Sequence, residues 1–303
     1  MATGAIKKFF RIQYVSDLHL EFYEKAAFPL LVKPAARNLA LAGDICQPGH
    51  RLFKPFFDYV SSNWDNVFYV TGNHEYYNYH HSKWASHLPE TVDERHKQIQ
   101  AILSNYRNVY YLHKDAPYFY LPKENVAIIG STLWTHIPED KAFKCVLGIG
   151  DYQYVSNTKG ERLRPAEVNQ MHFEEKLALQ KAIQFWTYQK AQICVITHHM
   201  PSYSLISSRY EGMDINCCFA SDSEALMNEN VKAWIYGHTH AACSGMIRKT
   251  FTAVNSRGYP NEAVSGFSST ACFEFSLNPE TDEDKPLQEV AAAAAAAEEV
   301  EWM

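Results

Sequence analysis

The chain has 303 residues, 47% of them hydrophobic and 14% aromatic, which allows a large buried core at the upper size of a single domain. Lys and Arg total 28 against 34 Asp and Glu, so the net charge is −6 and composition argues against nucleic acid or an anionic membrane as the partner. No run of 18 apolar residues is present, so no membrane span is predicted.

The first residues lead directly into a strand-like pattern. Residues 1–20 contain neither an apolar signal core nor a small-residue cleavage site. The seven cysteines are scattered and lack the CxxC spacing that holds zinc, so we expect reduced thiols. Both features predict a cytoplasmic protein. No pattern in the sequence predicts its oligomeric state.

Short apolar runs repeat one pattern along the chain, in which β-branched and aromatic residues lead into Asp, His, Gly or Asn. Runs of this length that are apolar on both faces predict strands of a buried sheet. Two further runs, at 126–134 and 270–277, predict additional strands that could be antiparallel. The five repeating runs lie at 11–19, 38–44, 66–75, 193–199 and 232–240.

Helix-length stretches separate these strands. This alternation predicts βαβ units, a mainly parallel core sheet and a layered α/β fold. The predicted helices lie at 51–62, 80–105, 164–190 and 222–229.

The composition changes near the end of the sequence. Residues 278–286, NPETDEDKP, are acidic and flanked by proline, as in a linker, so we expect one domain over 1–277. Residues 278–303 then form this linker and an alanine-rich segment with strong helix propensity. That tail could be a docked helix, a partner-binding helix or a loosely attached segment.

The polar residues that follow the predicted strands form one candidate site. In open α/β sheets the carboxyl ends of the strands converge on a shared crevice, so residues far apart in sequence can meet there. Carboxylates, an amide oxygen and imidazoles are poor candidates for burial unless they are paired or bind a metal. Such a mixed set suits Mn, Fe or Zn better than Mg. The set comprises Asp17, His19, Asp44, Asn73, His198, His238 and His240.

Five motifs in this order give the sequence a family resemblance. They are DLH at 17–19, GD at 43–44, GNHE at 72–75, THH at 197–199 and GHTH at 237–240. Together they resemble the calcineurin-like metallophosphoesterases over residues 11–240 at least. The resemblance implies two stacked mixed β-sheets flanked by helices, with a dinuclear centre at their edge.

The resemblance also implies the ligands of two divalent or trivalent metal ions. One ion would be held by Asp17, His19, Asp44 and His240, and the second by Asp44, Asn73, His198 and His238. Asp44 would bridge the two ions. His199 would then be structural or support a ligand.

The implied activity is hydrolysis of a phosphate ester by a hydroxide that bridges the metals. His74 would protonate the leaving group or hold a phosphate oxygen, with Glu75 or Asp17 as its orienting partner. The alternative role for His74 is to cap the loop after the third strand.

Weaker motifs suggest residues of a substrate pocket. Asp151, Tyr152, Asn255 and Arg257 are candidates, and Arg257 offers the planar fork that suits phosphate oxygens. An equally good interpretation is that these residues form turns with surface side chains. A small phosphate ester is the expected partner, and the sequence leaves monoester or diester open.

Two rival hypotheses remain for the whole chain. The first is a non-catalytic metal-binding scaffold, since a fold does not fix a function. The second is a phosphodiesterase or nuclease of the same superfamily, which would need a basic groove and aromatic platforms for bases.

Overall fold

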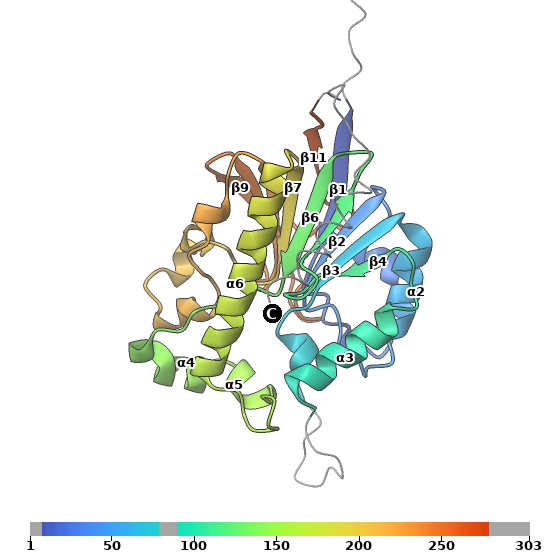
Figure 1. Cartoon of the computed structure of the whole chain (residues 1–303). Helices are drawn as coiled ribbons and strands as arrows, with labels where there is room; N and C mark the ends of the chain where they lie inside the picture. Colours follow the sequence, from blue (N-terminus) through green and yellow to red (C-terminus); the bar gives the residue numbers. More distant parts are fainter. Residues whose placement is uncertain (1–7, 79–89, 279–303) are drawn as a thin grey trace, which may run out of the picture.

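Two β-sheets packed face to face form the body of the protein, with helices on both outer sides (Figure 1). The computed structural model describes residues 8–78 and 90–278. This architecture confirms the predicted α/β fold of two stacked mixed sheets flanked by helices. Within the described residues, no helix is long and apolar enough to cross a membrane.

The first sheet has the strand order β11-β1-β2-β3-β4. Its strands β1 to β4 are parallel, and β11 pairs with β1 in the antiparallel sense. The strands are β1 (Phe9–Val15), β2 (Asn38–Ala42), β3 (Asn66–Val70), β4 (Val109–Tyr111) and β11 (Cys272–Ser276).

The second sheet has the strand order β5-β6-β7-β8-β10-β9. Its four central strands are parallel, and the edge strands β5 and β9 are antiparallel to their neighbours. The strands are β5 (Tyr118–Leu121), β6 (Val126–Ser131), β7 (Gln192–Thr197), β8 (Val231–Tyr236), β9 (Ala242–Ile247) and β10 (Thr250–Asn255).

Alternating side chains of the central strands fill two different cores, which explains why these strands are apolar on both faces. In β2, Ala40 and Ala42 pack between the sheets, while Leu39 and Leu41 pack outward against helices. The same alternation holds in β7 of the other sheet. Successive residues of a strand point to opposite faces, so a strand buried on both sides has no polar period.

Three longer helices cover the outer faces. Helices α2 (Phe53–Asn63) and α3 (Val92–Leu103) cover the first sheet, and α6 (Pro165–Tyr188) covers the second (Figure 1). A capping box starts α3: Thr91 Oγ1 accepts from Glu94 N at 3.2 Å, and Glu94 Oε2 accepts from Thr91 N at 2.8 Å.

The remaining helical elements are short and lie in the connections. The α-helices among them are α1 (Phe28–Leu31), α4 (Ala142–Gly148) and α5 (Asp151–Tyr154). The 3₁₀ turns are η1 (Leu20–Phe22), η2 (His74–Tyr76), η3 (Glu139–Lys141), η4 (Tyr203–Leu205), η5 (Ser208–Tyr210), η6 (Asp214–Cys218) and η7 (Glu224–Leu226).

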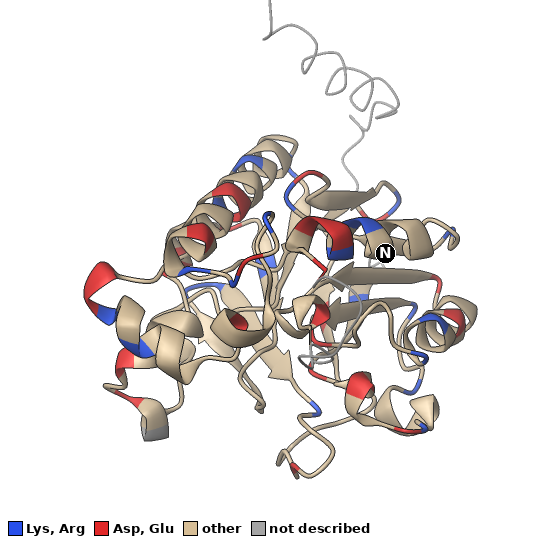
Figure 2. Ribbon diagram, turned by 90° about the horizontal axis from the view of Figure 1, so that it is seen from below, with Lys and Arg blue, Asp and Glu red and all other residues tan. Residues whose placement is uncertain are grey.

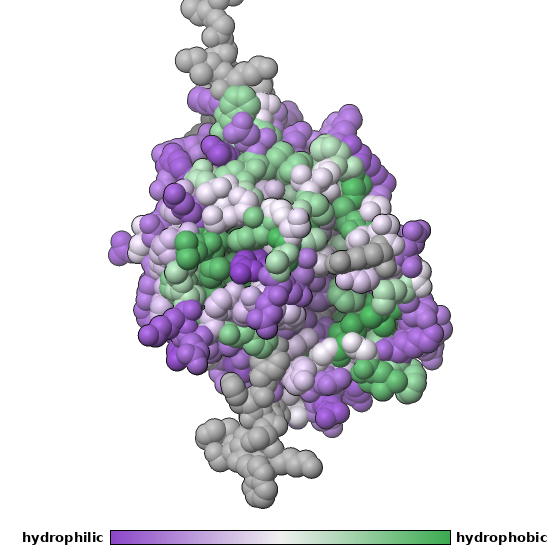
Figure 3. Space-filling view, turned by 180° about the vertical axis from the view of Figure 1, so that it is seen from behind, coloured by the Kyte–Doolittle hydropathy of each residue, from purple (hydrophilic) through white to green (hydrophobic). Residues whose placement is uncertain are grey.

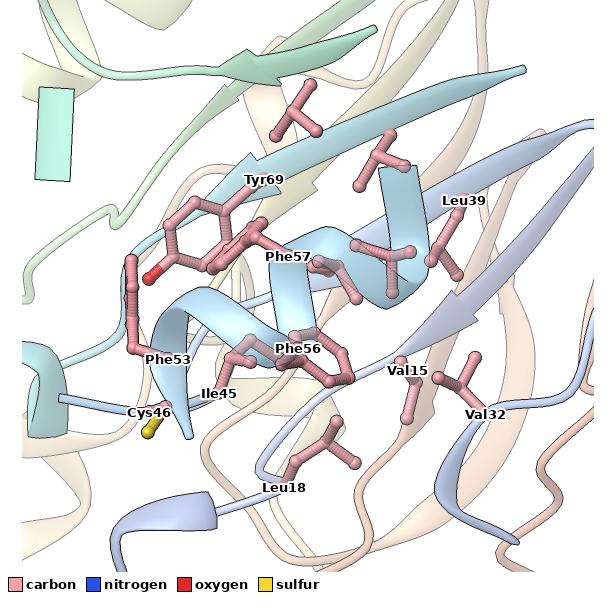
Figure 4. Close-up of a cluster of buried hydrophobic side chains, with 14 of the residues drawn as sticks. Val15, Leu18, Val32, Leu39, Ile45, Cys46, Phe53, Phe56, Phe57 and Tyr69 are labelled. Carbon is pink, nitrogen blue, oxygen red and sulfur yellow. The ribbon is translucent and has the colours of Figure 1, made fainter. Parts of the chain in front are cut away.

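Helix α2 anchors the loops that follow the first two strands. Its Phe56 and Phe57 pack in one fully buried cluster with Leu18 and Ile45 (Figure 4). Leu18 lies between two polar residues of the candidate site, and Ile45 follows a third. Burial of these apolar side chains therefore fixes where the neighbouring polar side chains point.

The structure differs from the sequence-based prediction at several elements. The expected helix 222–229 is only the turn η7, because Ser223 N donates to Pro201 O and Asn228 Nδ2 donates to Thr187 Oγ1 instead of continuing a helix. Helix α3 begins at Val92, and residues 80–89 of the expected helix 80–105 lie outside the described residues. The alternation of strands and helices indicated one mainly parallel core sheet, whereas the central strands form two sheets, as the family resemblance implied. Residues 279–303 of the expected tail lie outside the described part.

Candidate metal centre

The seven residues predicted from the strand ends meet at one edge of the sandwich. This is the lower edge in Figure 1, where the parallel strands of both sheets end, and Figure 2 views the molecule from that side. Strands β1, β2 and β3 of the first sheet deliver four of these side chains, and β7 and β8 of the second sheet deliver three. Five of the seven are at most 2% exposed, and they are Asp17, His19, Asp44, Asn73 and His198. The other two, His238 and His240, line one cavity together with Asp44 and Asn73.

One group of candidate ligand atoms belongs to Asp17, His19 and His240. His19 Nε2 lies 3.0 Å from His240 Nε2, and His240 Nε2 lies 3.7 Å from Asp17 Oδ1. Asp44 Oδ2 lies 3.8 Å from His19 Nε2. Atoms that share a metal at about 2.1 Å lie roughly 3.0–3.4 Å from one another, so these spacings are close to those of one coordination sphere.

A second group surrounds His198. Its Nε2 atom lies 3.0 Å from Asn73 Oδ1, 3.2 Å from His238 Nδ1 and 3.4 Å from Asp44 Oδ2. The Asp44 carboxylate therefore stands between the two groups, with one oxygen within 4 Å of a histidine in each.

The hydrogen bonds at the outer nitrogens show that the first group consists of acceptors. His19 Nδ1 bonds to Glu21 Oε1 at 3.1 Å, and His240 Nδ1 bonds to Glu262 Oε2 at 2.5 Å. Ionised carboxylates only accept, so each Nδ1 carries a proton, and the tautomer that this favours leaves the lone pair on Nε2 for a metal. Two such lone pairs 3.0 Å apart repel unless positive charge lies between them.

Hydrogen bonds also orient the candidate ligand atoms of the second group. His198 Nδ1 donates to Ala42 O at 2.9 Å, which directs its Nε2 toward the group. Asn73 Nδ2 donates to Asp151 Oδ1 at 2.7 Å, which turns Asn73 Oδ1 inward. His238 Nε2 is buried without a partner among the described residues. The residues present thus fit a pair of cations held by nitrogen and oxygen ligands.

The electrostatics of the protein alone favour positive charge at this place. Burial lowers the pKa of His198, but the Asp44 carboxylate outweighs it and raises that pKa to about 10. Burial likewise raises the pKa of Asp44, yet the surrounding histidines hold it well below its ordinary value. A buried carboxylate that stays ionised is a ready partner for a cation.

Several of these residues have a strained backbone. Asp17, His19, Asp44, His238 and His240 all have left-handed φ values, between 44° and 70°. Such conformations cost about 1–3 kcal/mol for residues other than glycine, and they persist where the surroundings over-determine them. The loops after β1, β2 and β8 therefore hold their side chains in a preset direction.

Glycines allow the loops to approach this closely. A Cβ on Gly72 would lie 2.1 Å from Asp44 Oδ1 and 2.6 Å from His198 Cε1. A Cβ on Gly43, whose φ is +83°, would lie 2.4 Å from His198 Nδ1. The glycines of the GD and GNHE motifs thus leave room for the carboxylate and the imidazole between them.

Glu75 ties the loops after β2 and β3 together. Its carboxylate accepts from Gly72 N at 2.7 Å, Ile45 N at 2.8 Å and Asp44 N at 3.1 Å, and Tyr69 OH donates to it at 2.9 Å. Burial, with the Asp44 charge nearby, raises the pKa of Glu75 to about 7. These bonds position Asp44, and both oxygens of Glu75 are engaged by groups other than His74.

His74 faces the same cavity, and its contacts differ from the expected ones. Its Nδ1 lies 3.3 Å from Glu21 Oε1 and its Nε2 lies 3.2 Å from Tyr259 OH. Sequence reasoning named Glu75 or Asp17 as its partner, whereas the structure has Glu21 in that place. Burial lowers the pKa of His74, but the carboxylates of Asp44 and Glu21 raise it by more than burial lowers it. The pKa of His74 therefore lies above its ordinary value.

None of the four residues suggested for a substrate pocket is among the described residues that line this cavity, and Arg257 lines a neighbouring hollow with Phe267. Asp151 orients Asn73, and Tyr152 packs in a buried apolar cluster. Asn255 Nδ2 donates to Tyr14 O and Ser268 O, so its amide braces β10. Arg257 donates to Glu262 O at 3.0 Å and lies over the Phe267 ring.

Four supporting residues have no equivalent in the sequence-based prediction. Glu21 and Glu262 fix the tautomers of His19 and His240, and Ser256 Oγ donates to Asp17 Oδ2 at 2.6 Å. Tyr259 contacts His74. Glu21 could have been identified from its place two residues after His19, whereas the others come from the irregular segment after β10. His199 is buried against Trp134, and burial beside His198 lowers its pKa to about 3.

The chain is similar in sequence or in fold to several known proteins. An uncharacterized protein of Acanthamoeba polyphaga mimivirus is 27% identical over 267 residues, which cover 83% of this chain and 92% of that protein. The crystal structure of phosphopantetheinyl hydrolase from Mycobacterium tuberculosis is similar with a TM-score of 0.61 and 15% identity, over 89% of this chain and 96% of that one. A dimetal phosphatase from Danio rerio gives a TM-score of 0.46 and 15% identity, over 81% and 86%.

The family profile described as calcineurin-like phosphoesterase matches residues 10–242, which include all seven candidate ligands and His74. The match spans well over half of the 303 residues. The chain therefore belongs to the calcineurin-like phosphoesterase family.

Proposed function

We propose that this protein hydrolyses phosphate esters at a centre of two cations, with Mn, Fe or Zn as the metals. Asp17, His19, Asp44 and His240 would hold one cation, and Asp44, Asn73, His198 and His238 the other. The observation that carries the proposal is the convergence of these seven side chains on two groups of nitrogen and oxygen atoms that can bind a metal. Such an arrangement is stable only around positive charge.

The cations, when bound, offset the charge of the phosphoryl oxygens and lower the pKa of water enough for hydroxide to form near neutral pH. The protein residues direct the rest. Glu21 accepts from His74 Nδ1, which orients the ring so that Nε2 faces the cavity beside Tyr259. His74 in its protonated form carries the proton on Nε2 that the departing ester oxygen requires.

The proposal is tested by turnover of phenyl phosphate after loading with Mn²⁺. We expect hydrolysis that a chelator abolishes, and a loss of roughly 10²–10⁴-fold in kcat for His74→Ala, the range ascribed to general acid catalysis. His136→Ala provides a control, because His136 is exposed and does not line the cavity.

Two results would contradict the proposal. One is a metal-loaded protein that binds two cations and turns over none of a panel of mono- and diesters, as a scaffold would. The other is hydrolysis that His74→Ala and His136→Ala leave equally unchanged.

A further inference from the structure

A large cavity opens beside the candidate metal centre. Its volume is about 990 Å³, at the upper end for sites that enclose a whole small molecule. Asp44, Asn73, His74, His238 and His240 form one end of it. The cavity therefore has room for an organic group attached to a phosphate that binds at the metal end.

Much of the rest of the cavity wall is apolar. The segments after β7 and β8 and the end of α4 contribute Ile149, Met200, Leu205, Ile206, Ile215 and Phe219, with the polar side chains Ser207 and Asn216 among them. The Phe219 ring joins this wall to the metal end, since its centroid lies 4.8 Å from that of His238. Met200 and Phe219 pack into small buried clusters, so the wall is fixed by the core behind it. Side chains of this kind bind an organic group by removing apolar surface from water.

Charged groups are scarce along this wall. Among the side chains that the structure describes, the cavity is lined by the carboxylates Asp44 and Glu262 and by no Lys or Arg. In the view from below, Lys and Arg are interspersed with Asp and Glu on the surrounding ribbon (Figure 2). A second phosphate or a carboxylate on the organic group would therefore leave water without gaining a cation beyond the metal end.

The apolar wall continues to the surface. Met213 and Tyr210 line the cavity and are also 44% and 41% exposed. Leu147, 64% exposed, precedes the lining residue Gly148 in α4. Hydrophobic residues also gather in patches on the face seen from behind (Figure 3). Exposed apolar side chains that rim an apolar cavity mark a path for a ligand of the same character.

We infer that the natural substrate is a phosphate ester whose organic part is uncharged and apolar, bound along this wall from the metal end to the rim at Met213. The inference rests on the proposed function and adds the chemical class of the leaving group. Nucleotides with several phosphates and acidic phosphopeptides are thereby disfavoured, because the described wall offers them no cation.

The test compares para-substituted phenyl phosphates on the Mn²⁺-loaded protein. Phenyl, 4-methylphenyl and 4-butylphenyl phosphate differ in apolar length, while 4-(2-carboxyethyl)phenyl phosphate matches the butyl ester in length but carries a charge. An alkyl spacer keeps the phenol leaving groups similar, so differences in kcat/KM report binding along the wall. Each methylene buried is expected to raise kcat/KM up to roughly fourfold, equivalent to about 0.8 kcal/mol.

We expect the butyl ester to exceed phenyl phosphate and the carboxyethyl ester at least tenfold in kcat/KM, mainly through KM. Met213→Glu should reduce this preference, because it places a charge at the rim. Met246→Glu is the matched control: Met246 is 61% exposed on β9 and does not line the cavity.

Equal kcat/KM for the butyl and carboxyethyl esters overturns the inference and leaves the proposed hydrolysis standing. A chain-length dependence that Met213→Glu and Met246→Glu alter to the same extent also overturns it. Absence of turnover with every ester overturns the inference together with the proposed function.

Discussion

Asp151 accepts a hydrogen bond from Asn73 Nδ2 at 2.7 Å, although 78 positions separate the two residues in the chain. Tyr77 OH donates to the same carboxylate oxygen at 2.6 Å. The bond directs Asn73 Oδ1 toward His198 Nε2, 3.0 Å away. Helix α5, which contributes none of the candidate ligands, thus positions one of them.

Replacing Asp151 by Ala should weaken the proposed cation site at Asn73 without emptying the proposed site at His19. Loss of a residue that orients a metal ligand typically costs 10–100-fold in metal affinity or activity, and we expect a decrease of that size in both. Titration with Mn²⁺, followed by kcat at saturating metal, measures the two effects. Asp214→Ala serves as the control, since Asp214 is an exposed residue paired with Lys144. Unchanged metal affinity in Asp151→Ala would show that Asn73 needs no such support.

Asp44 and Asp17 should differ in how many cations their loss removes. Asp44 Oδ2 lies 3.8 Å from His19 Nε2 and 3.4 Å from His198 Nε2, whereas Asp17 Oδ1 lies 3.7 Å from His240 Nε2 of the first group and contacts the second group only through the backbone N of His238. We expect Asp44→Asn to retain neither cation after desalting and to lose about 10³-fold or more in kcat, as two-metal catalysis requires. Asp17→Asn should retain one. Elemental analysis of both variants measures the stoichiometry, and two bound cations in Asp44→Asn would refute the bridging role.

The strand ends could be predicted from sequence because burial on both faces leaves a recognisable apolar run before each polar cluster. Residues Ala40 and Ala42 face one core while Leu39 and Leu41 face another, and no polar period interrupts them. Strand β9 has no such signal, since Gly245 and Met246 are exposed at the edge of the sheet. Edge strands pair through backbone groups that any sequence supplies. The edge strands β4, β5 and β9 were therefore not predicted from the sequence.

The supporting residues of the site were harder to predict than the candidate ligands. Glu262 contacts His240 because the irregular segment after β10 folds back over the candidate metal centre. No spacing of residues within that segment predicts this path of the chain. Asp151 was suggested for the substrate pocket, and its sequence context gave no sign that its carboxylate accepts a hydrogen bond from Asn73. A polar residue beside glycine shows that a turn is present, not which partner its side chain will meet.

Gly72 is expected to tolerate no side chain, in contrast to Gly245. A Cβ at Gly72 would lie 2.1 Å from Asp44 Oδ1 and 2.7 Å from Asp44 N, whereas a Cβ at Gly245 meets nothing within 4 Å. Overpacking a fixed site usually costs 1–3 kcal/mol, so Gly72→Ala should destabilise the protein by at least about 2 kcal/mol. Gly245→Ala should stay within about 0.5 kcal/mol of the parent. Urea denaturation measures the stability of both variants. Equal midpoints would mean that the loops after β2 and β3 can move apart to accommodate the added methyl group.

Glu175 on α6 carries a pH dependence that is independent of the metal centre. Its Oε2 atom accepts a hydrogen bond from Trp134 N at 3.1 Å, and burial raises its pKa to about 7. The unfolded chain releases this proton near the ordinary carboxyl pKa, whereas the folded chain keeps it until about pH 7. The stability that Glu175 contributes is therefore complete at low pH and is lost as the pH rises through this interval.

Replacing Glu175 by Gln keeps an oxygen that can accept from Trp134 N and removes the charge. Because one pKa unit corresponds to about 1.4 kcal/mol, the variant should gain stability relative to the parent by about 2 kcal/mol between pH 5 and pH 8. Any penalty from the new amide hydrogens is the same at both pH values, so it cancels in this difference. Urea denaturation midpoints of both proteins at the two pH values measure it. A difference that stays constant with pH would mean that Glu175 ionises in the folded protein as easily as in the unfolded chain, and that its surroundings in the fold impose no cost on its charge.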